Sequence, residues 1–218
     1  MIDRHACPQK SNVARRERTV EEARNYENTR FDSSRRVRSL DEFEKTFAQR
    51  VLRMIGTDSH IVDIPCGSGR FFPIFSAARQ LTMVDRSPSM LQAAREKVGG
   101  AEDVDLIQAE IPSLPLADNA ADLCFCMRLF HHFKNDDNRL NALKELARVT
   151  RKYVALSFYN RSCLRFYRRK ILRKRIRGNY ISFGHLADLA RQAGLEVVER
   201  FPKLNLIDQQ CLVILKKS

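Results

Sequence analysis

The chain has 218 residues, of which 44% are hydrophobic, and a formal net charge of +13. This length and apolar content are enough for a single three-layer domain with a buried core. No apolar run approaches the roughly 20 residues of a membrane-spanning helix, and the N-terminus lacks the apolar core of a secretory signal. We therefore expect a soluble, cytoplasmic protein.

Six cysteines are spread along the chain without the paired spacing of a metal site. Several of them fall within apolar runs, where cysteine usually acts as a small hydrophobic residue. The pattern favours a reducing compartment and predicts no bound metal.

The N-terminal part precedes the first expected strand and has helical spacing over 20–31 and 40–55. We interpret residues 1–56 as an N-terminal helical cap and residues 57–218 as the main domain. No internal repeat is evident.

The most informative segment follows the cap and reads HIVDIPCGSGR, residues 60–70. Its apolar residues suit a strand buried in a parallel sheet, and Gly67 and Gly69 let the backbone pass close to a ligand. A second apolar run ends at Asp85, 22 residues after Asp63, the spacing at which an acid accepts hydrogen bonds from ribose hydroxyls. The segment therefore predicts a pocket for an adenosine-type cofactor.

The segment differs in two ways from the motifs that bind dinucleotides and phosphates, and these differences narrow the choice of cofactor. Phe72 occupies the position where a dinucleotide fingerprint requires a small residue, and no Gly-Lys-Ser/Thr run is present to grip phosphates. Acids on both sides of the turn, Asp63 and Asp85, suit a ligand that carries a sulfonium and an ammonium group. These features predict S-adenosylmethionine.

Strands and helices alternate along the rest of the chain, which predicts an α/β, doubly wound and mostly parallel sheet. The expected strands are 60–64, 81–85, 104–108, 122–127, 153–158, 195–201 and 210–216, the last two forming an antiparallel hairpin. The expected helices are 69–79, 87–98, 135–150 and 183–193, with Gly194 as the C-terminal cap of the last one.

At this point the sequence resembles the class I S-adenosylmethionine-dependent methyltransferases, and among them the small-molecule, ubiquinone-type branch. The matching segments are DIPCGSGR, VDRSPSML, QAEIPSLPLADNAADLCFCMRLFHHF, LKELARV and AGLEVVE. The resemblance implies a seven-stranded Rossmann-like sheet and methyl transfer to a small acceptor. It also implies that the cofactor is bound by Asp63, Pro65, Cys66, Gly67, Gly69, Asp85, Arg86, Gln108, Ala109, Glu110 and Met127.

Two of these residues depart from the family pattern. Pro65 stands where the family usually has the first glycine of the turn, and it removes a backbone donor. Gln108 stands where an aspartate usually accepts from the adenine amino group, and its amide oxygen can accept the same bond without charge.

In related enzymes an N-terminal segment packs over the cofactor mouth, so Tyr26 and Arg30 are candidates to reach the methionine carboxylate. An ordinary solvated surface helix is the favoured alternative for that segment.

The chemistry depends mostly on placing the acceptor in line with the activated methyl group, and a base is needed only for a poorly ionised acceptor. His131 and His132, just beyond the fourth strand, and Tyr159, after the fifth, are the candidate catalytic residues. Packing roles are the alternative for each, and for His185 a surface or packing role is preferred. Arg128 is a candidate contact for an anionic substrate, with an ordinary surface arginine as the alternative.

The second unusual segment is basic and spans residues 161–177, inside an insert over 161–180 that precedes the last helix. It holds nine cations and no acid, which leaves +4 for the rest of the chain. Leu164, Tyr167, Ile171 and Leu172 recur at helical spacing, which predicts a basic amphipathic helix. The residues expected to contact an anion are Arg165, Arg168, Arg169 and Arg173.

Three partners fit this insert: an anionic membrane that carries a lipid-like acceptor, RNA, or a phosphorylated small substrate. A solvated helix with its apolar face on the domain is the plain alternative. We prefer the membrane or an anionic amphiphile, because aromatic residues mix with the cations. Two functional hypotheses follow: an active methyltransferase, acting on a small or lipid-like acceptor or else on RNA, and a weakly catalytic protein that binds RNA or membrane through its basic face.

Overall fold

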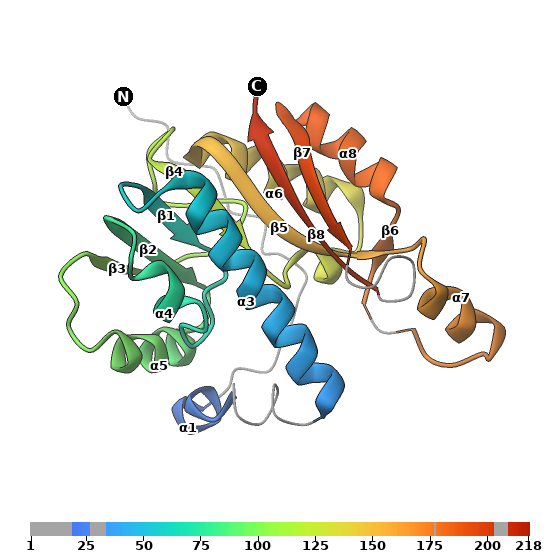
Figure 1. Ribbon diagram of the computed structural model, residues 1–218, viewed down its shortest axis with the longest axis horizontal. Helices are drawn as coiled ribbons and strands as arrows, with labels where there is room; N and C mark the ends of the chain where they lie inside the picture. Colours follow the sequence, from blue (N-terminus) through green and yellow to red (C-terminus); the bar gives the residue numbers. More distant parts are fainter. Residues whose placement is uncertain (1–18, 27–33, 177, 203–208) are drawn as a thin grey trace, which may run out of the picture.

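A computed structural model describes residues 19–26, 34–176, 178–202 and 209–218, and its architecture is a single mixed sheet covered by helices on both faces (Figure 1). Seven strands follow one another across the sheet in the order β3-β2-β1-β4-β5-β8-β7, and the short β6 pairs with β5. The strands are β1 His60–Asp63, β2 Gln80–Asp85, β3 Val104–Gln108, β4 Ala121–Cys126, β5 Thr150–Asn160, β6 Tyr180–Ile181, β7 Leu195–Pro202 and β8 Gln210–Lys217.

The pairing directions confirm the predicted topology. β1 pairs in parallel with β2 and β4, and β8 runs antiparallel to both β5 and β7. The order of the strands reverses beside β1, since the chain continues to β2 on one side and returns to β4 on the other. Ligands in open α/β sheets bind at the carboxyl ends of the strands at such a reversal.

The helices form one layer on each face of the sheet. They are α1 Val20–Arg24, α3 Arg35–Ile55, α4 Phe72–Phe75, α5 Pro88–Val98, the 3-10 turn η1 Phe130–His132, α6 Asp136–Val149, α7 Leu164–Ile171 and α8 Phe183–Gln192. α3, α4 and α5 contribute to the core on one face, and α6 and α8 contribute to the core on the other. α7 belongs to neither layer and extends away from the sheet (Figure 1).

Local sequence accounts for where several helices begin. Asn135 accepts a hydrogen bond from the backbone N–H of Asn138 and so caps α6, and Ser182 caps α8 by accepting from His185. α5 begins with Pro88, whose missing N–H is not needed in the first turn. These starts agree with the predicted helices to within a residue.

The helix expected over 69–79 is wrong in extent, because α4 is a single turn. Gly69 has φ of +81°, which is outside the helical region, so no helix can begin there. A turn therefore continues through Phe71, and α4 starts with Pro73 in its first turn and ends before Ser76. Phe71 and Phe75 both pack edge-on against Phe125 of β4, with ring centroids 4.8 Å apart in each pair.

The N-terminal helix α3 shares the core of the sheet. Its Phe47, Ala48 and Val51 are buried with residues of β4 and β8, so this part of the expected cap covers a face of the sheet. Tyr26 lies beside Met90 and Ala93 of α5. The division of the chain at residue 56 stays a prediction, and Arg30 lies outside the described residues.

The cysteines act as small hydrophobic residues, as the sequence indicates. The five in the described part of the chain, Cys66, Cys124, Cys126, Cys163 and Cys211, are buried free thiols. Burial raises the pKa of Cys124 to about 12, so this thiol stays protonated at neutral pH. Among the described residues no group of three possible metal ligands comes together. No helix in the same residues is long and apolar enough to cross a bilayer.

Candidate active site

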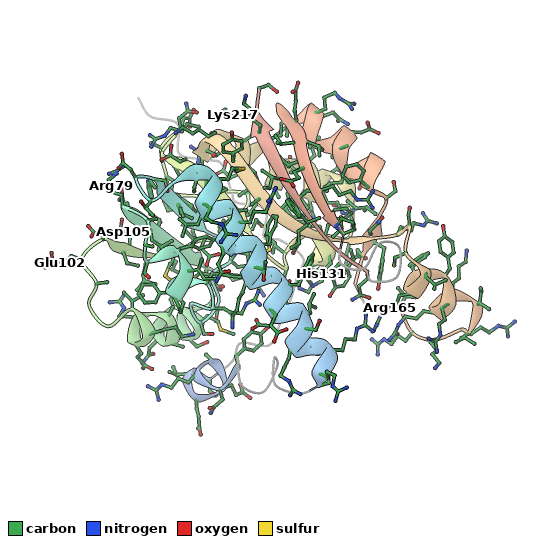
Figure 2. All side chains as sticks on the ribbon, in the orientation of Figure 1. Arg79, Glu102, Asp105, His131, Arg165 and Lys217 are labelled. Carbon is green, nitrogen blue, oxygen red and sulfur yellow. The ribbon has the colours of Figure 1, made fainter. Side chains whose placement is uncertain are left out.

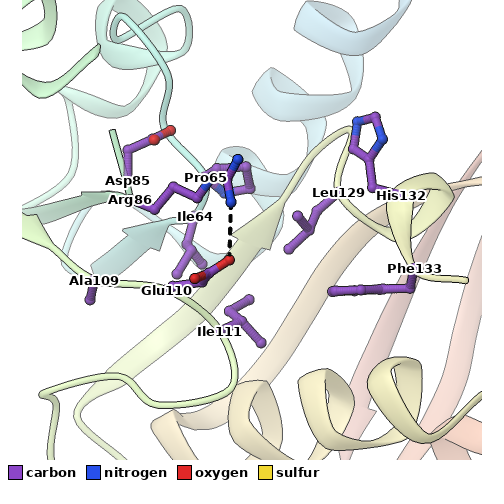
Figure 3. A pocket seen from close by; sticks show the side chains of 10 residues that line it. All are labelled: Ile64, Pro65, Asp85, Arg86, Ala109, Glu110, Ile111, Leu129, His132 and Phe133. Atoms are coloured by element: carbon purple, nitrogen blue, oxygen red, sulfur yellow. Dashed lines mark hydrogen bonds and ion pairs between the residues drawn. The ribbon is translucent and has the colours of Figure 1, made fainter. Parts of the chain in front are cut away.

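A mainly apolar pocket opens at the carboxyl ends of β1 and β2, next to the loop that follows β3 and the segment that follows β4 (Figure 3). Its lining residues are Ile64, Pro65, Asp85, Arg86, Ala109, Glu110, Ile111, Leu129, His132 and Phe133. Six of these ten, Pro65, Asp85, Arg86, Ala109, Glu110 and His132, are predicted site residues. The pocket therefore lies where the sheet topology and the sequence motifs both indicate it.

The glycine turn after β1 is shaped by the conformations that its glycines adopt. Gly67 has φ of +58°, and its N–H donates a 2.9 Å hydrogen bond to Oδ2 of Asp85. A Cβ on Gly69 would lie only 3.2 Å from the side chain of Met83 and close to Ala94 of α5. The expected need for glycine at both positions thus has a physical basis in backbone conformation and in close packing.

Asp85 is held at the tip of β2 by two backbone donors. Its Oδ1 accepts from the N–H of Ser87 and its Oδ2 from the N–H of Gly67, each at 2.9 Å. Burial raises the pKa of this carboxyl, although the two N–H donors oppose the shift. Each oxygen keeps a second lone pair, and the side chain lines the pocket, so it can accept hydrogen bonds from ligand hydroxyls.

Asp63, at the end of β1, is the most unusual group of the site. Its carboxyl is almost completely buried, and neither oxygen has a hydrogen-bond partner among the described residues. Burial raises its pKa well above the ordinary value, and the positive charge of Arg70 opposes that shift only in part. A buried acid without a partner is destabilising unless a cation joins it. An ammonium or sulfonium ligand would supply that cation.

The other rim of the pocket carries the residues predicted to meet the base of the cofactor. Arg86 forms an ion pair with Glu110 at 3.4 Å, drawn as a dashed line in Figure 3. Gln108, at the end of β3, donates from its side-chain amide to the carbonyl of Arg86 at 3.3 Å. Its carbonyl oxygen can therefore face outward, as adenine recognition requires. Met127 is buried just beyond β4.

The structure separates the two histidines that follow β4. His132 lies on the rim of the pocket, whereas His131 is buried and stacks on Tyr159 with ring centroids 4.2 Å apart and planes 10° apart. In Figure 2 His131 is labelled near the middle of the view. The backbone carbonyl of His131 accepts from the N–H of Asn179 at 2.9 Å, which ties this segment to the end of the basic insert.

A buried ion-pair network that the sequence analysis missed lies beside the glycine turn. Glu44 of α3 is completely buried and accepts hydrogen bonds from Arg70, Arg128 and Gln210. Its contacts are 2.6 Å to Arg70 and 2.9 Å to each of the other two. One carboxylate thus joins the N-terminal helix, the cofactor turn, the segment after β4 and the last strand.

A sequence signal for this network exists. Glu44 occupies the same helical face as Phe47, Ala48 and Val51, at spacings of three, four and seven residues. A charged residue on an otherwise apolar face indicates a buried ion pair. Arg128, predicted to contact an anionic substrate, directs its guanidinium at Glu44, and its backbone has φ of +57°.

A second cleft, polar and about 590 Å³ in volume, includes Lys134, the residue that follows Phe133 of the pocket lining. It is lined by Lys134, Asp136, Arg139, Arg161, Phe166, Ile176, Gly178, Asn179, Tyr180, Ile181, Ser182 and His185. Asp136, the only acid of this lining, is bound by Arg139 and by His185, each at 2.7 Å. Lys134 and Arg161 have no carboxylate partner in the described part of the chain, so the cleft is cationic. His185 is exposed and its ring is bound to Asp136, and its expected surface or packing role stays a prediction.

The predicted anion-binding arginines lie apart from the pocket. Arg165, Arg168 and Arg169 are on α7, and Arg173 follows that helix with φ of +48°. Arg169 donates to the backbone carbonyl of Arg175. None of these residues lines either the pocket or the polar cleft.

Comparison with known proteins identifies the domain. Residues 62–158 match the family model described as a methyltransferase domain. The chain is 31% identical over 120 residues to malonyl-[acyl-carrier protein] O-methyltransferase of Pectobacterium atrosepticum, which is 54% of this chain and 45% of that protein. It is 31% identical over 96 residues to tRNA (carboxymethyluridine(34)-5-O)-methyltransferase alkbh8 of Xenopus tropicalis, which is 43% of this chain and 14% of that protein.

Solved structures show the same fold. Magnesium protoporphyrin IX methyltransferase of Synechocystis PCC 6803, solved with bound SAH, superposes with a TM-score of 0.71 at 13% identity and covers 91% of this chain and 97% of that one. The match places a methyltransferase domain of the S-adenosylmethionine-dependent class at residues 62–158. The solved structure shows that the fold is shared. The chain spans less than half the length of the two relatives named above, whose acceptors differ, so the branch of the family stays open.

Proposed function

We propose that the protein transfers a methyl group from S-adenosylmethionine to a small acceptor that carries an anionic group and a lipid-like body. The observation that carries this proposal is the cationic cleft, in which Lys134 and Arg161 form no ion pair within the described residues and Asp136 is already bound by Arg139 and His185. The two linings meet in the sequence, since His132 and Phe133 line the pocket and the next residue, Lys134, lines the cleft. An acceptor whose anion lies in the cleft could present its reacting atom to the pocket.

The cofactor roles that we propose involve residues that line the pocket and residues next to it, such as Asp63 and Gln108. Asp63 would pair with the ammonium group, Asp85 would accept from the ribose hydroxyls, and Gln108 would accept from the adenine amino group. Pro65, Cys66, Gly67, Gly69, Arg86, Ala109, Glu110 and Met127 would complete the binding surface. When bound, S-adenosylmethionine supplies an electrophilic methyl group.

The protein's own contribution to the reaction is placement of the acceptor and exclusion of water. Leu129 and Phe133 give the pocket its apolar wall. His132 on the rim is the best-placed group to take a proton from an acceptor that is not ionised. We assign His131 and Tyr159 a supporting role, because their rings stack on each other behind that rim.

Asp85→Asn tests the ribose contact. We expect a loss of about 1.5–3 kcal/mol in cofactor affinity, since a carboxylate that receives charge-assisted hydrogen bonds becomes a neutral amide. Isothermal titration calorimetry with S-adenosylmethionine measures this change. Asp105→Asn, on the exposed part of β3, is the matched control and should bind as the wild type does. Equal affinities for the two variants would show that the pocket is misassigned.

The acceptor proposal is tested with radiolabelled S-adenosylmethionine and separate fractions of anionic small molecules, lipid extract and transfer RNA. We expect label in an anionic, lipid-soluble product. Lys134→Gln combined with Arg161→Gln should lower kcat/KM for that acceptor roughly tenfold or more, the value of one charged hydrogen bond. The affinity of this double variant for S-adenosylmethionine should not change. The control is Lys144→Gln, on the surface of α6.

The remaining outcomes decide between the alternatives. Label that appears only in transfer RNA would favour an RNA methyltransferase, for which the alkbh8 relative is the precedent. Cofactor binding without transfer to any fraction would favour a weakly catalytic protein that works through its basic insert. In either case the proposed partner of the insert, an anionic membrane or RNA, has to be tested separately.

A further inference from the structure

The outward face of α7 is formed by large apolar side chains. Leu164, Tyr167, Ile171 and the following Leu172 are 60%, 51%, 79% and 50% exposed, and we call them the α7 stripe. Only two other large apolar residues in the described part of the chain, Met54 and Val198, are noticeably exposed. Exposed apolar groups are thus concentrated on one short helix that projects from the domain (Figure 1).

Helical geometry explains why the stripe faces outward. Leu164, Tyr167 and Ile171 are three and seven residues apart and share one side of the helix. Phe166 is on the other side and packs against Tyr180, with ring centroids 5.1 Å apart. The sequence-based alternative of an apolar face resting on the domain is therefore wrong for these residues, because the domain is contacted through Phe166.

Cations alternate with the stripe residues along the sequence. From Leu164 to Ile176 the chain has seven cations and no acid. They are Arg165, Arg168, Arg169, Lys170, Arg173, Lys174 and Arg175. None of them forms an ion pair with a carboxylate of the described residues, so the charge is available to an external anion.

We propose that α7 docks on an anionic lipid bilayer, with the α7 stripe at the boundary between headgroups and acyl chains and the cations at the lipid phosphates. A short helix with a strong apolar side and a cationic remainder is the signature of an interfacial helix. RNA would meet the cations equally well but would leave Leu164 and Ile171 in water, since its phosphates give apolar side chains nothing to bury against. The proposal goes beyond the proposed reaction and depends on α7 alone.

Docking is measured by flotation of the full chain with two kinds of vesicle. One kind is phosphatidylcholine alone, and the other also contains about 30% phosphatidylglycerol, an anionic lipid. We expect binding only to the anionic vesicles, weakening as salt rises. The double variant Leu164→Gln/Ile171→Gln keeps every charge and leaves the helical propensity nearly unchanged. It should bind anionic vesicles at least about tenfold more weakly, because two side chains lose their apolar burial in the bilayer. Its matched control is Met54→Gln/Val198→Gln, which should bind as the wild type does.

The charge is tested with Arg168→Gln/Lys170→Gln/Lys174→Gln, which should lose roughly tenfold or more in binding to anionic vesicles. The control removes the same number of positive charges elsewhere on the surface, through Arg53→Gln/Arg95→Gln/Lys144→Gln. Its binding to anionic vesicles should fall clearly less. All variants should keep their affinity for S-adenosylmethionine, so a failure of docking is distinguishable from a failure of the proposed reaction.

Two results would overturn the proposal. One is a Leu164→Gln/Ile171→Gln variant that binds anionic vesicles as tightly as its control, which would mean that the stripe does not enter the bilayer. The other is a single-stranded RNA that binds more tightly than the vesicles at equal salt and is indifferent to the apolar double variant. That result would make α7 a nucleic-acid surface.

Discussion

Glu44→Ala is expected to lower the free energy of unfolding by about 3–5 kcal/mol, because it removes the shared partner of two guanidinium groups from a buried site. Arg70 and Arg128 have only 8% and 16% of their side-chain surface exposed, so water cannot replace the carboxylate. Arg70 keeps its 2.6 Å ion pair with Asp41 in the variant, so the loss falls mainly on the Arg128 side of the network. Urea unfolding, followed by circular dichroism, measures the loss. Glu42→Ala is the matched control, since Glu42 is an exposed acid on the same helix, and it should change stability by less than about 0.5 kcal/mol.

A second variant tests the charge of the Glu44 side chain separately from its volume. Glu44→Gln keeps the volume and one acceptor oxygen but turns an N–H group toward a guanidinium, so its stability should lie between those of the wild type and the alanine variant. Because Arg70 follows the glycine turn directly, both variants should also weaken cofactor binding. A Glu44→Ala protein as stable as the Glu42→Ala control would show that the network contributes nothing.

Asp63→Asn is expected to act in opposite directions on stability and on binding. In the cofactor-free protein it removes a buried acid without a partner, so the free energy of unfolding at neutral pH should rise by about 1–3 kcal/mol. Cofactor affinity should fall by about 3–5 kcal/mol, because the ammonium group would be buried without its counter-charge. Thermal unfolding and calorimetry on the same sample measure both changes.

The pH dependence gives an independent check on Asp63. Burial raises the pKa of Asp63 in the folded protein above its unfolded value, so the folded state binds the proton more tightly. The wild type therefore loses stability relative to Asp63→Asn as pH rises from the ordinary carboxyl range through the raised pKa. Its cofactor affinity should rise over the same range, because only the ionised acid pairs with a cation. A stability difference that does not change with pH would contradict this assignment.

Much of the fold follows from local patterns in the sequence. The runs that end at Asp63 and Asp85 become β1 and β2 because buried parallel strands need continuous apolar residues. The closing hairpin and the capped helices α5, α6 and α8 also lie where the spacing and cap residues predict them. The place of the pocket was predictable for the same reason, since a turn and an acid at the end of a strand are local features that meet at one edge of a parallel sheet. Its role as the cofactor site stays a proposal.

Other features depended on contacts between distant segments. The start of α4 was mispredicted because the positive φ of Gly69 keeps a helix from beginning there. The partner of Arg128 is a glutamate 84 residues away along the chain, so no spacing rule could have placed it. The polar cleft likewise combines α6, the insert and α8, which meet only in the folded molecule.

By itself the sequence determined the class of domain, its methyl donor and the strands that end at Asp63 and Asp85, because these depend on short-range periodicity and turn chemistry. Only the tertiary structure decided that Asp63 is buried without a partner, that Glu44 joins four segments, and that the apolar side of α7 faces away from the domain. Burial and orientation arise from the packing of segments far apart in the chain, and that packing sets both the charge of a site and the surface left for a partner.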